Sequence, residues 1–212
     1  MLKSTALGLG AFLYFTTAMA QTGPGGVGNT SNNGLWLRTD ALNLTDGDVV
    51  ASWDDISGNG NTAHQDTASQ RPVYHSTSAL NGMPVVRLDG EDDRLLVDDT
   101  DILDNTTGIT YFAVIRPSNF GSQPKWILGK RITFTTDVEY AYTWFFWDQG
   151  RLNLDVHTQN NRRATAISFA NDQNYLLSWD FDGSRPVESR STMYKDDSYK
   201  LAFRENSTAL PN

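Results

Sequence analysis

Four side chains that carry oxygen ligands are spaced at positions 1, 3, 5 and 12 of one loop: Asp55, Ser57, Asn59 and Asp66. Gly60 stands at position 6, which gives the loop the spacing of an EF-hand calcium loop. Calcium selects oxygen ligands, so the spacing is compatible with a bound calcium ion. However, the last ligand is Asp rather than a bidentate Glu, and no flanking helices are predicted. The alternative is an Asx-type turn whose side chains bond only the backbone.

A second acidic cluster follows a predicted strand and consists of Asp89, Glu91, Asp92 and Asp93. These carboxylates could also ligate calcium, because they supply hard oxygen ligands within a few residues of one another. The alternative is a solvated β-turn, in which acidic residues are common. The sequence leaves both interpretations open.

Carboxylates that could catalyse glycoside hydrolysis are sparse. Glycoside hydrolases hold a pair of carboxylates, one on each side of the scissile bond. Asp180 and Asp182 alternate on a predicted strand, but they stand where it runs into a turn. The chain has no serine elbow, no His-Glu-x-x-His helix and no phosphate-binding glycine loop. His64, His75 and His157 lack zinc-site spacing. These patterns favour binding over catalysis.

An aromatic hairpin is predicted between residues 142 and 157. Gln149 and Gly150 predict a two-residue turn, and pairing outward from it places Trp147 opposite Leu152 on the core face. The opposite face then carries aromatic and polar side chains together: Tyr142, Trp144, Phe146, Asn153, Asp155 and His157. Rings that stack on sugar C–H groups beside polar hydrogen-bonding groups suit a carbohydrate ligand. Alternatively, the rings pack under a loop, and a bulge of one residue would exchange the two faces.

The totals fit one soluble domain. The chain has 212 residues, 39% of them hydrophobic, which supplies enough apolar material for one core. Its net charge of -8 argues against nucleic acid or an anionic membrane as a partner and suits neutral ligands or divalent cations. It contains no cysteine, which excludes disulfides and thiolate metal sites. We expect a monomer, or one module of a larger multidomain chain.

The N-terminus carries the pattern of a signal peptide over residues 1–20. Lys3 gives a positive start, an apolar stretch follows, and Ala18-Met19-Ala20 forms an A-x-A cleavage signal. Residues 21–34 are rich in Gly, Ser, Thr and Asn and predict a flexible lead-in. The protein is therefore expected to be secreted or held at the cell surface, without membrane insertion.

The remaining residues, 35–212, predict an all-β domain. Short segments of period-two hydrophobicity recur with turn residues between them, which is typical of an antiparallel sandwich. Leu35–Arg38 is predicted as the first strand, and Ile109–Ile115 is apolar on both faces, which predicts a central strand covered front and back. The one helix-like candidate is residues 99–103.

Four segments carry a family resemblance when taken together: residues 34–40, 52–61, 87–90 with Asp93, and 109–117. They resemble the laminin-G-like, concanavalin A-like lectin/glucanase domains of secreted, Bacteroidetes-type bacterial surface proteins, over roughly residues 24–210. The resemblance implies a two-sheet antiparallel jelly roll used for adhesion or carbohydrate binding, often with calcium. In such domains two more strands follow Met193-Tyr194, and the last pairs near the first strand. We therefore expect this sandwich to lack its last strands and to be truncated at the C-terminus, which would leave the first strand with an exposed edge.

Together these patterns predict a non-catalytic extracellular binding domain for a glycan or for a cell-surface or matrix ligand, with calcium as a stabilising ion. A glycoside hydrolase on the same fold and a structural spacer module of a larger surface protein are the alternatives.

Overall fold

The computed structural model describes Gly23 and residues 28–104, 107–130, 142–156, 162–196 and 199–203. The predicted signal peptide and His157 lie outside these residues. The fold is all-β, with 38% strand and 8% helix, and every strand pair in its sheets is antiparallel. This confirms the fold class predicted from the period-two pattern.

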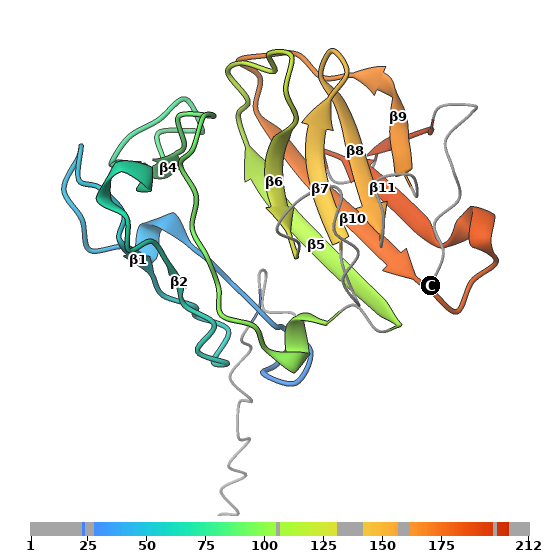
Figure 1. Cartoon of the computed structure of the whole chain (residues 1–212), viewed down its shortest axis with the longest axis horizontal. Helices are drawn as coiled ribbons and strands as arrows, with labels where there is room; N and C mark the ends of the chain where they lie inside the picture. The colour runs from blue at the N-terminus through green and yellow to red at the C-terminus, as the bar shows by residue number, and fades with distance from the viewer. Residues whose placement is uncertain are drawn as a thin grey trace, which may run out of the picture.

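Two four-stranded sheets lie face to face and form the larger part of the molecule (Figure 1). The front sheet has the order β6-β7-β8-β9 and consists of β6 (Lys125–Gly129), β7 (Tyr142–Trp147), β8 (Arg151–Val156) and β9 (Arg162–Ser168). The back sheet has the order β12-β11-β10-β5 and consists of β5 (Gly108–Ile115), β10 (Tyr175–Asp182), β11 (Ser191–Lys195) and β12 (Tyr199–Lys200). A short 3-10 helix, η5 (Val187–Ser189), connects β10 to β11.

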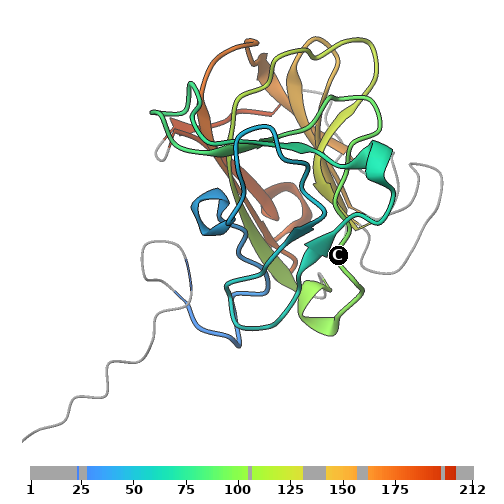
Figure 2. The same ribbon diagram turned by 90° about the vertical axis from the view of Figure 1, so that its left-hand side faces the viewer.

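The N-terminal part, residues 28–104, is built mostly from loops and stands beside one edge of the sandwich (Figures 1 and 2). It contains two small sheets, in which β1 (Ser52–Trp53) pairs with β2 (Ala63–His64) and β3 (Val73–His75) pairs with β4 (Val85–Arg87). It also contains the 3-10 helices η2 (Thr39–Ala41), η3 (Ala68–Gln70) and η4 (Asp101–Leu103). The helix-like candidate at residues 99–103 is thus a single 3-10 turn.

Few described hydrogen bonds connect the N-terminal part to the sandwich. The Lys125 ammonium donates to the carbonyl of Gly90, and the Asn174 amide donates to the carbonyl of Ala79 at 2.8 Å. Near η4, the Tyr142 hydroxyl donates to the Leu103 carbonyl at 3.2 Å. The N-terminal part is therefore held against the sandwich at separate points.

The hydrophobic core fills the space between the two sheets. On β10 every second side chain is buried, because a strand between two neighbours turns alternate residues into the core. The Trp179 ring stacks on Tyr111 at 5.1 Å, and its indole N–H donates to the hydroxyl of Ser191 at 2.7 Å. The buried core residues are Phe120, Tyr142, Trp144, Phe146, Leu152, Leu154, Val156, Phe169, Tyr175, Leu177, Trp179, Phe181, Met193 and Leu201.

Two strand predictions need correction, and one strand was not predicted. Leu35–Arg38 joins no sheet within the described residues, because the Asp55 turn holds it instead: the Trp36 N–H donates to Asp55 at 2.9 Å. Ile109–Ile115 does form a strand, β5, but among the described residues β5 is an edge strand and not a central one. Residues 162–168, which had no strand prediction, form β9.

Candidate ligand-binding face

The β7–β8 hairpin turns over three residues rather than two. Asp148, Gln149 and Gly150 all have positive φ, at 51°, 64° and 82°. As a result Trp147 pairs with Arg151, and the register differs by one residue from the predicted one. Because side chains alternate along a strand, this shift exchanges the two faces of β7, whereas the residues of β8 keep their predicted faces.

The aromatic residues that the sequence placed on a ligand-binding face lie in the core. Tyr142, Trp144 and Phe146 are 6%, 0% and 3% exposed and face the back sheet. Their predicted exposure is wrong, because the three-residue turn gives them Val156, Leu154 and Leu152 as cross-strand partners. Asn153 and Asp155 do point away from the core, as predicted, but both are buried.

The outer side of the front sheet carries a different set of aromatic and polar residues. We name it the outer aromatic face, and its members are Trp126, Phe145, Trp147, Asn153, Asp155 and Arg162. In register, Trp126 lies opposite Phe145 and Phe145 lies opposite Asn153. A second row places Asp155 opposite Arg162. The four strands therefore bring these side chains together on the outer side of the front sheet.

Arg162 is the centre of this face. Its Nε and Nη2 atoms donate to the two carboxylate oxygens of Asp155, each at 2.8 Å. Its guanidinium also lies 5.0 Å from the ring centroid of Phe145 and 4.8 Å from that of Trp147. A planar guanidinium can make a bidentate pair with a carboxylate and stack on aromatic rings at the same time. Arg162 thereby fixes the positions of the rings and of the acid.

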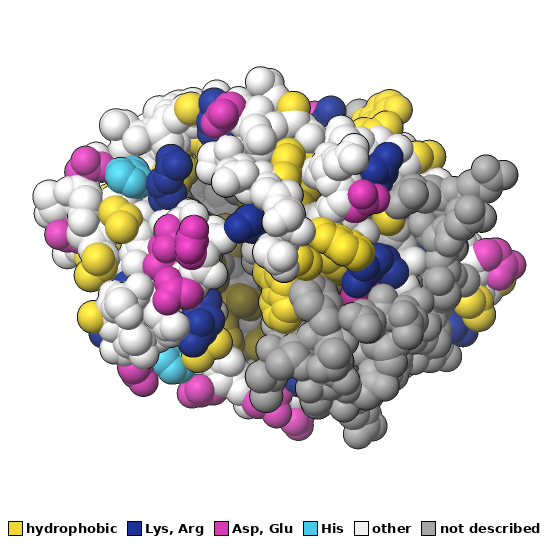
Figure 3. Space-filling model, turned by 45° about the horizontal axis from the view of Figure 1, so that its top comes forward, with side chains coloured by type: hydrophobic (Ala, Val, Ile, Leu, Met, Phe, Trp, Pro, Cys, Tyr) yellow, Lys and Arg dark blue, Asp and Glu magenta, His cyan; other side chains and the backbone are white. Residues whose placement is uncertain are grey.

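Two tryptophans of the outer aromatic face reach solvent. Trp126 and Trp147 are each 39% exposed. A bulge in β6 turns Trp126 outward, while Leu128 faces the core opposite Trp144. Trp147 stands two residues beyond Phe145, and Phe145 is the cross-strand partner of Trp126. The two tryptophans are therefore diagonal neighbours on adjacent strands, and diagonal residue pairs of this kind lie about 7–8 Å apart. In Figure 3, which views the front sheet obliquely, hydrophobic side chains reach the surface beside basic ones.

The two alternating carboxylates of β10 share one neighbouring cation. Arg185 lies 3.5 Å from Asp180 and 3.0 Å from Asp182. The hydroxyl of Ser184, which donates to Asp182 at 2.6 Å, is the main cause that lowers the pKa of that carboxyl. A general acid for glycoside hydrolysis needs a raised pKa. The lowered pKa of Asp182 is the opposite of what that role requires.

The Asp55 carboxylate of the predicted calcium loop is engaged by donors from its own surroundings. One oxygen accepts from the N–H groups of Trp36 and Ser57, both at 2.9 Å. The other accepts from the Ser57 hydroxyl at 2.7 Å and from the Asn61 N–H at 3.1 Å. Burial by itself raises the pKa of Asp55, but these hydrogen bonds together lower it below its ordinary value.

The other predicted ligands of that loop have separate surroundings. Ser57 is buried, and the Asn59 amide donates to the Asn33 carbonyl at 2.8 Å. Asp66 is exposed beyond β2, where its backbone carbonyl accepts from Arg71. These contacts support the Asx-type turn that the sequence left open. Calcium binding at this loop stays a prediction.

The second acidic cluster is a hydrogen-bonded turn at the surface. One oxygen each of Asp89, Asp92 and Asp93 lie within 4.8 Å of one another. The N–H of Glu91, at 2.8 Å, is the main cause that lowers the pKa of Asp89. Calcium binding here also stays a prediction.

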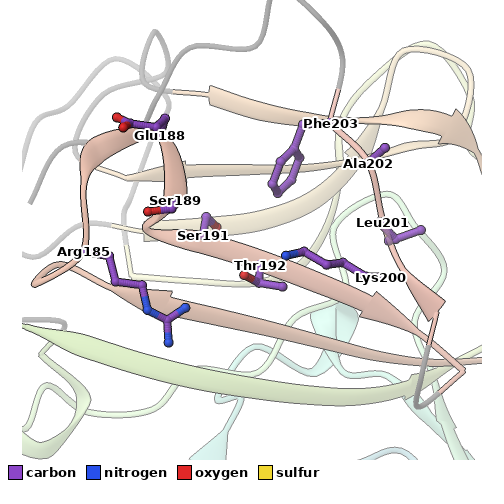
Figure 4. Close-up of a pocket in the computed structure, with 9 residues that line it drawn as sticks. All are labelled: Arg185, Glu188, Ser189, Ser191, Thr192, Lys200, Leu201, Ala202 and Phe203. Carbon is purple, nitrogen blue, oxygen red and sulfur yellow. The ribbon is translucent and has the colours of Figure 1, made fainter.

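A cavity of about 360 Å³ opens between η5, β11 and the end of β12 (Figure 4). The ring of Phe203 and the side chain of Lys200 extend toward the same space, whereas Glu188 points away from it. No sequence pattern pointed to this cavity. Its lining combines Arg185, Glu188, Ser189, Ser191, Thr192, Lys200, Leu201, Ala202 and Phe203. The mixture of acidic, basic and apolar groups selects no single ligand chemistry.

Sequence reasoning missed four residues of the outer aromatic face: Phe145 and Trp147, which the predicted register turned toward the core, and Trp126 and Arg162. Arg162 was missed because the adjacent Arg163 made the start of β9 look like a polar loop. The alternation Ala164-Thr165-Ala166-Ile167 after it was the available signal. Trp126 lies on β6, where a bulge decides which way it points, and residue types do not reveal a bulge.

Comparison with protein-family models, with curated proteins and with solved structures finds no significant match for this chain. The fold itself defines a class: an all-β protein with two antiparallel sheets in a sandwich. Among the described residues, no helix is long and apolar enough to span a membrane.

Proposed function

We propose that this domain is a non-catalytic extracellular binding domain whose ligand is a carbohydrate, held on the outer aromatic face. The observation that carries the proposal is the pair of half-exposed indoles, Trp126 and Trp147, on adjacent strands. Indole faces bind the C–H surfaces of sugar rings through apolar contact. Two such faces side by side can hold neighbouring sugar units of one chain.

The polar neighbours supply the second requirement of a sugar site. Arg162 keeps 21% of its side chain exposed, while its partner Asp155 is fully buried. A site of this kind combines apolar surface with a few fixed polar groups that orient the ligand. The paired Asp155 acts here as an anchor for Arg162 and not as a catalytic acid, which supports binding over hydrolysis.

A structural spacer is the second candidate, and the burial of the central residues favours it. Phe145, Asn153 and Asp155 are 0%, 2% and 0% exposed, so much of the outer aromatic face stabilises the fold whatever else it does. The two candidates differ in what Trp126 and Trp147 contact in solution.

Binding of the intact chain to a glycan array tests the proposal. The expected result is retention of one glycan class by the unmodified chain, and loss of about tenfold or more in affinity for Trp147→Ala and for Trp126→Ala. The unfolding midpoints of the variants should stay close to that of the unmodified chain. Phe112→Ala, on the outer side of the back sheet, is the matched control and should bind normally. Failure to retain any glycan, or unchanged binding by both Trp variants, would favour the spacer.

A further inference from the structure

β5 is an edge strand whose outward backbone groups can be identified from its ladder. The Gly183 N–H donates to the Thr107 carbonyl at 2.7 Å, so these two residues form a hydrogen-bonded pair in register with β10 and β5. In an antiparallel ladder, hydrogen-bonded and non-bonded pairs alternate. The odd-numbered residues of β5 therefore bond β10. The even-numbered ones, Gly108, Thr110, Phe112 and Val114, direct their N–H and C=O groups to the open edge.

The pairing of β10 with its other neighbour gives an independent check. Asp182 donates to Arg190 and Asp196 donates to Leu176, at 2.8 Å and 2.7 Å. The even-numbered residues of β10 thus bond β11, which leaves its odd-numbered residues for β5. Within the described residues, no backbone hydrogen bond reaches the open edge of β5.

The side chains of β5 are incompletely covered on both faces. On the outer side Phe112 and Val114 are 66% and 65% exposed, with Leu176 of β10 beside them. On the inner side Ile109, Tyr111, Ala113 and Ile115 pack on the core but stay only partly buried. The inward residues of the next strand, β10, are all buried. One more strand beside β5 would cover both sets.

Charge distinguishes β5 from the other edge strands of the two large sheets. β6 carries Lys125, β9 carries Arg162 and Arg163, and β12 carries Lys200. Charged residues on edge strands are a common way to prevent pairing with another chain. None of the eight residues of β5 is charged or proline. Its edge is therefore suited to an incoming strand that is itself uncharged.

From this geometry we propose that the open edge of β5 binds one extended strand of a partner polypeptide by β-augmentation. The partner strand continues the ladder β12-β11-β10-β5. It is uncharged and apolar at alternating positions on both faces, because it contacts Phe112 and Val114 outside and the Tyr111 row inside. Figures 1 and 2 place the N-terminal part on the same side of the sandwich as β5, which favours a single strand over a whole second copy.

Fluorescence anisotropy with a labelled peptide tests the proposal. The probe has the uncharged sequence of residues 108–115, with lysines added at both ends for solubility. We expect saturable binding to the intact chain and a loss of about tenfold or more for Phe112→Lys and for Thr110→Pro. Thr110→Pro removes an N–H from the open edge and leaves the β10 ladder intact, so its unfolding midpoint should change little. Tyr194→Lys, on the same sheet face but away from the edge, is the control and should bind normally.

Two results would overturn the proposal. One is the absence of peptide binding by the unmodified chain, or equal binding by Thr110→Pro. The other is a dimer of the unmodified chain in sedimentation that Phe112→Lys dissociates and the peptide does not, because the edge then serves a second copy. Phe112→Lys should retain its glycan whichever result is obtained, because Phe112 lies on the back sheet and not on the outer aromatic face. Glycan binding by this variant therefore tests the proposed carbohydrate binding separately from strand binding.

Discussion

β7 and β5 look alike in sequence and differ in the folded protein. Both are hydrophobic on their two faces, but β7 lies between β6 and β8, whereas β5 has a single neighbour, β10, within the part of the chain that the structure describes. The outward Phe145 of β7 is fully buried, and the outward Phe112 of β5 is 66% exposed. Hydrophobic alternation thus shows which faces are apolar. The neighbouring strands and the contacts of residues such as Arg162 decide which of those faces is covered.

The largest expected effect distinguishes a matched pair of Phe→Ala substitutions, one on each strand. Phe145→Ala should lower the free energy of unfolding by about 3–5 kcal/mol, because it opens a cavity in a fully buried site. Phe112→Ala should change it by less than about 0.5 kcal/mol, because that ring already lies mostly in water. Urea unfolding of both variants measures the two values. Similar losses for the two would mean that the outer sides of β7 and β5 are equally covered.

A second pair of variants isolates the role of Arg162 in covering β7. Arg162→Met should cost about 3 kcal/mol, because it leaves the buried carboxylate of Asp155 without its guanidinium. Arg185→Met removes an exposed arginine beside Asp180 and Asp182 and should have little effect. Thermal and urea unfolding compare the two. A loss for Arg162→Met as small as that for Arg185→Met would show that the bidentate pair contributes nothing measurable.

The smallest expected effect is in the N-terminal part, where side-chain hydrogen bonds take the place of most strand pairing. Asp55→Asn should cost about 1 kcal/mol at neutral pH, because Asp55 is partly exposed and solvent screens its bonds. The pKa of Asp55 is lowered in the folded state, so its contribution is present above the ordinary carboxyl pKa of about 3.9. That contribution is lost as the pH falls through the lower folded-state value.

Unfolding of the unmodified chain and of Asp55→Asn between neutral and strongly acid pH checks this prediction. The two curves should converge at the acid end, and Asp66→Asn, at an exposed position, should follow the unmodified chain. Parallel curves would contradict it.

Thermal unfolding of the unmodified chain with calcium and with a chelator tests the metal prediction, since an ion that binds the folded state raises the unfolding midpoint.

The sequence was sufficient for the fold class because period-two hydrophobicity depends on local spacing alone. It was not sufficient for the hairpin register. Asp148 and Gln149 adopt positive φ, which non-glycine residues rarely do, so the Gln149-Gly150 pair pointed to a shorter turn. One residue in the turn decided whether Trp144 or Trp147 would face solvent.

The order of the strands within the sheets could not be predicted from the sequence either. β5 reads as a central strand because Ile109–Ile115 is apolar on both faces, but its place is set by pairing with β10, about sixty residues later in the chain. Leu35–Arg38 reads as a strand, and yet the Asp55 carboxylate takes the N–H of Trp36. Such competition between distant partners has no local signature. For the same reason the outer aromatic face could not be predicted, because it depends on Arg162, whose strand was not predicted.

The bend at Asp148, Gln149 and Gly150 also bears on how the gene can change. Loss of a single codon there, with the strands still paired, would turn one of the two strands over, so that either Trp144 of β7 or its partner Leu154 of β8 would point away from the core. Most surface loops tolerate in-frame insertions and deletions, but this one sets the parity of the whole hairpin. Natural variation in length is therefore expected to accumulate elsewhere in the chain and to spare these three positions.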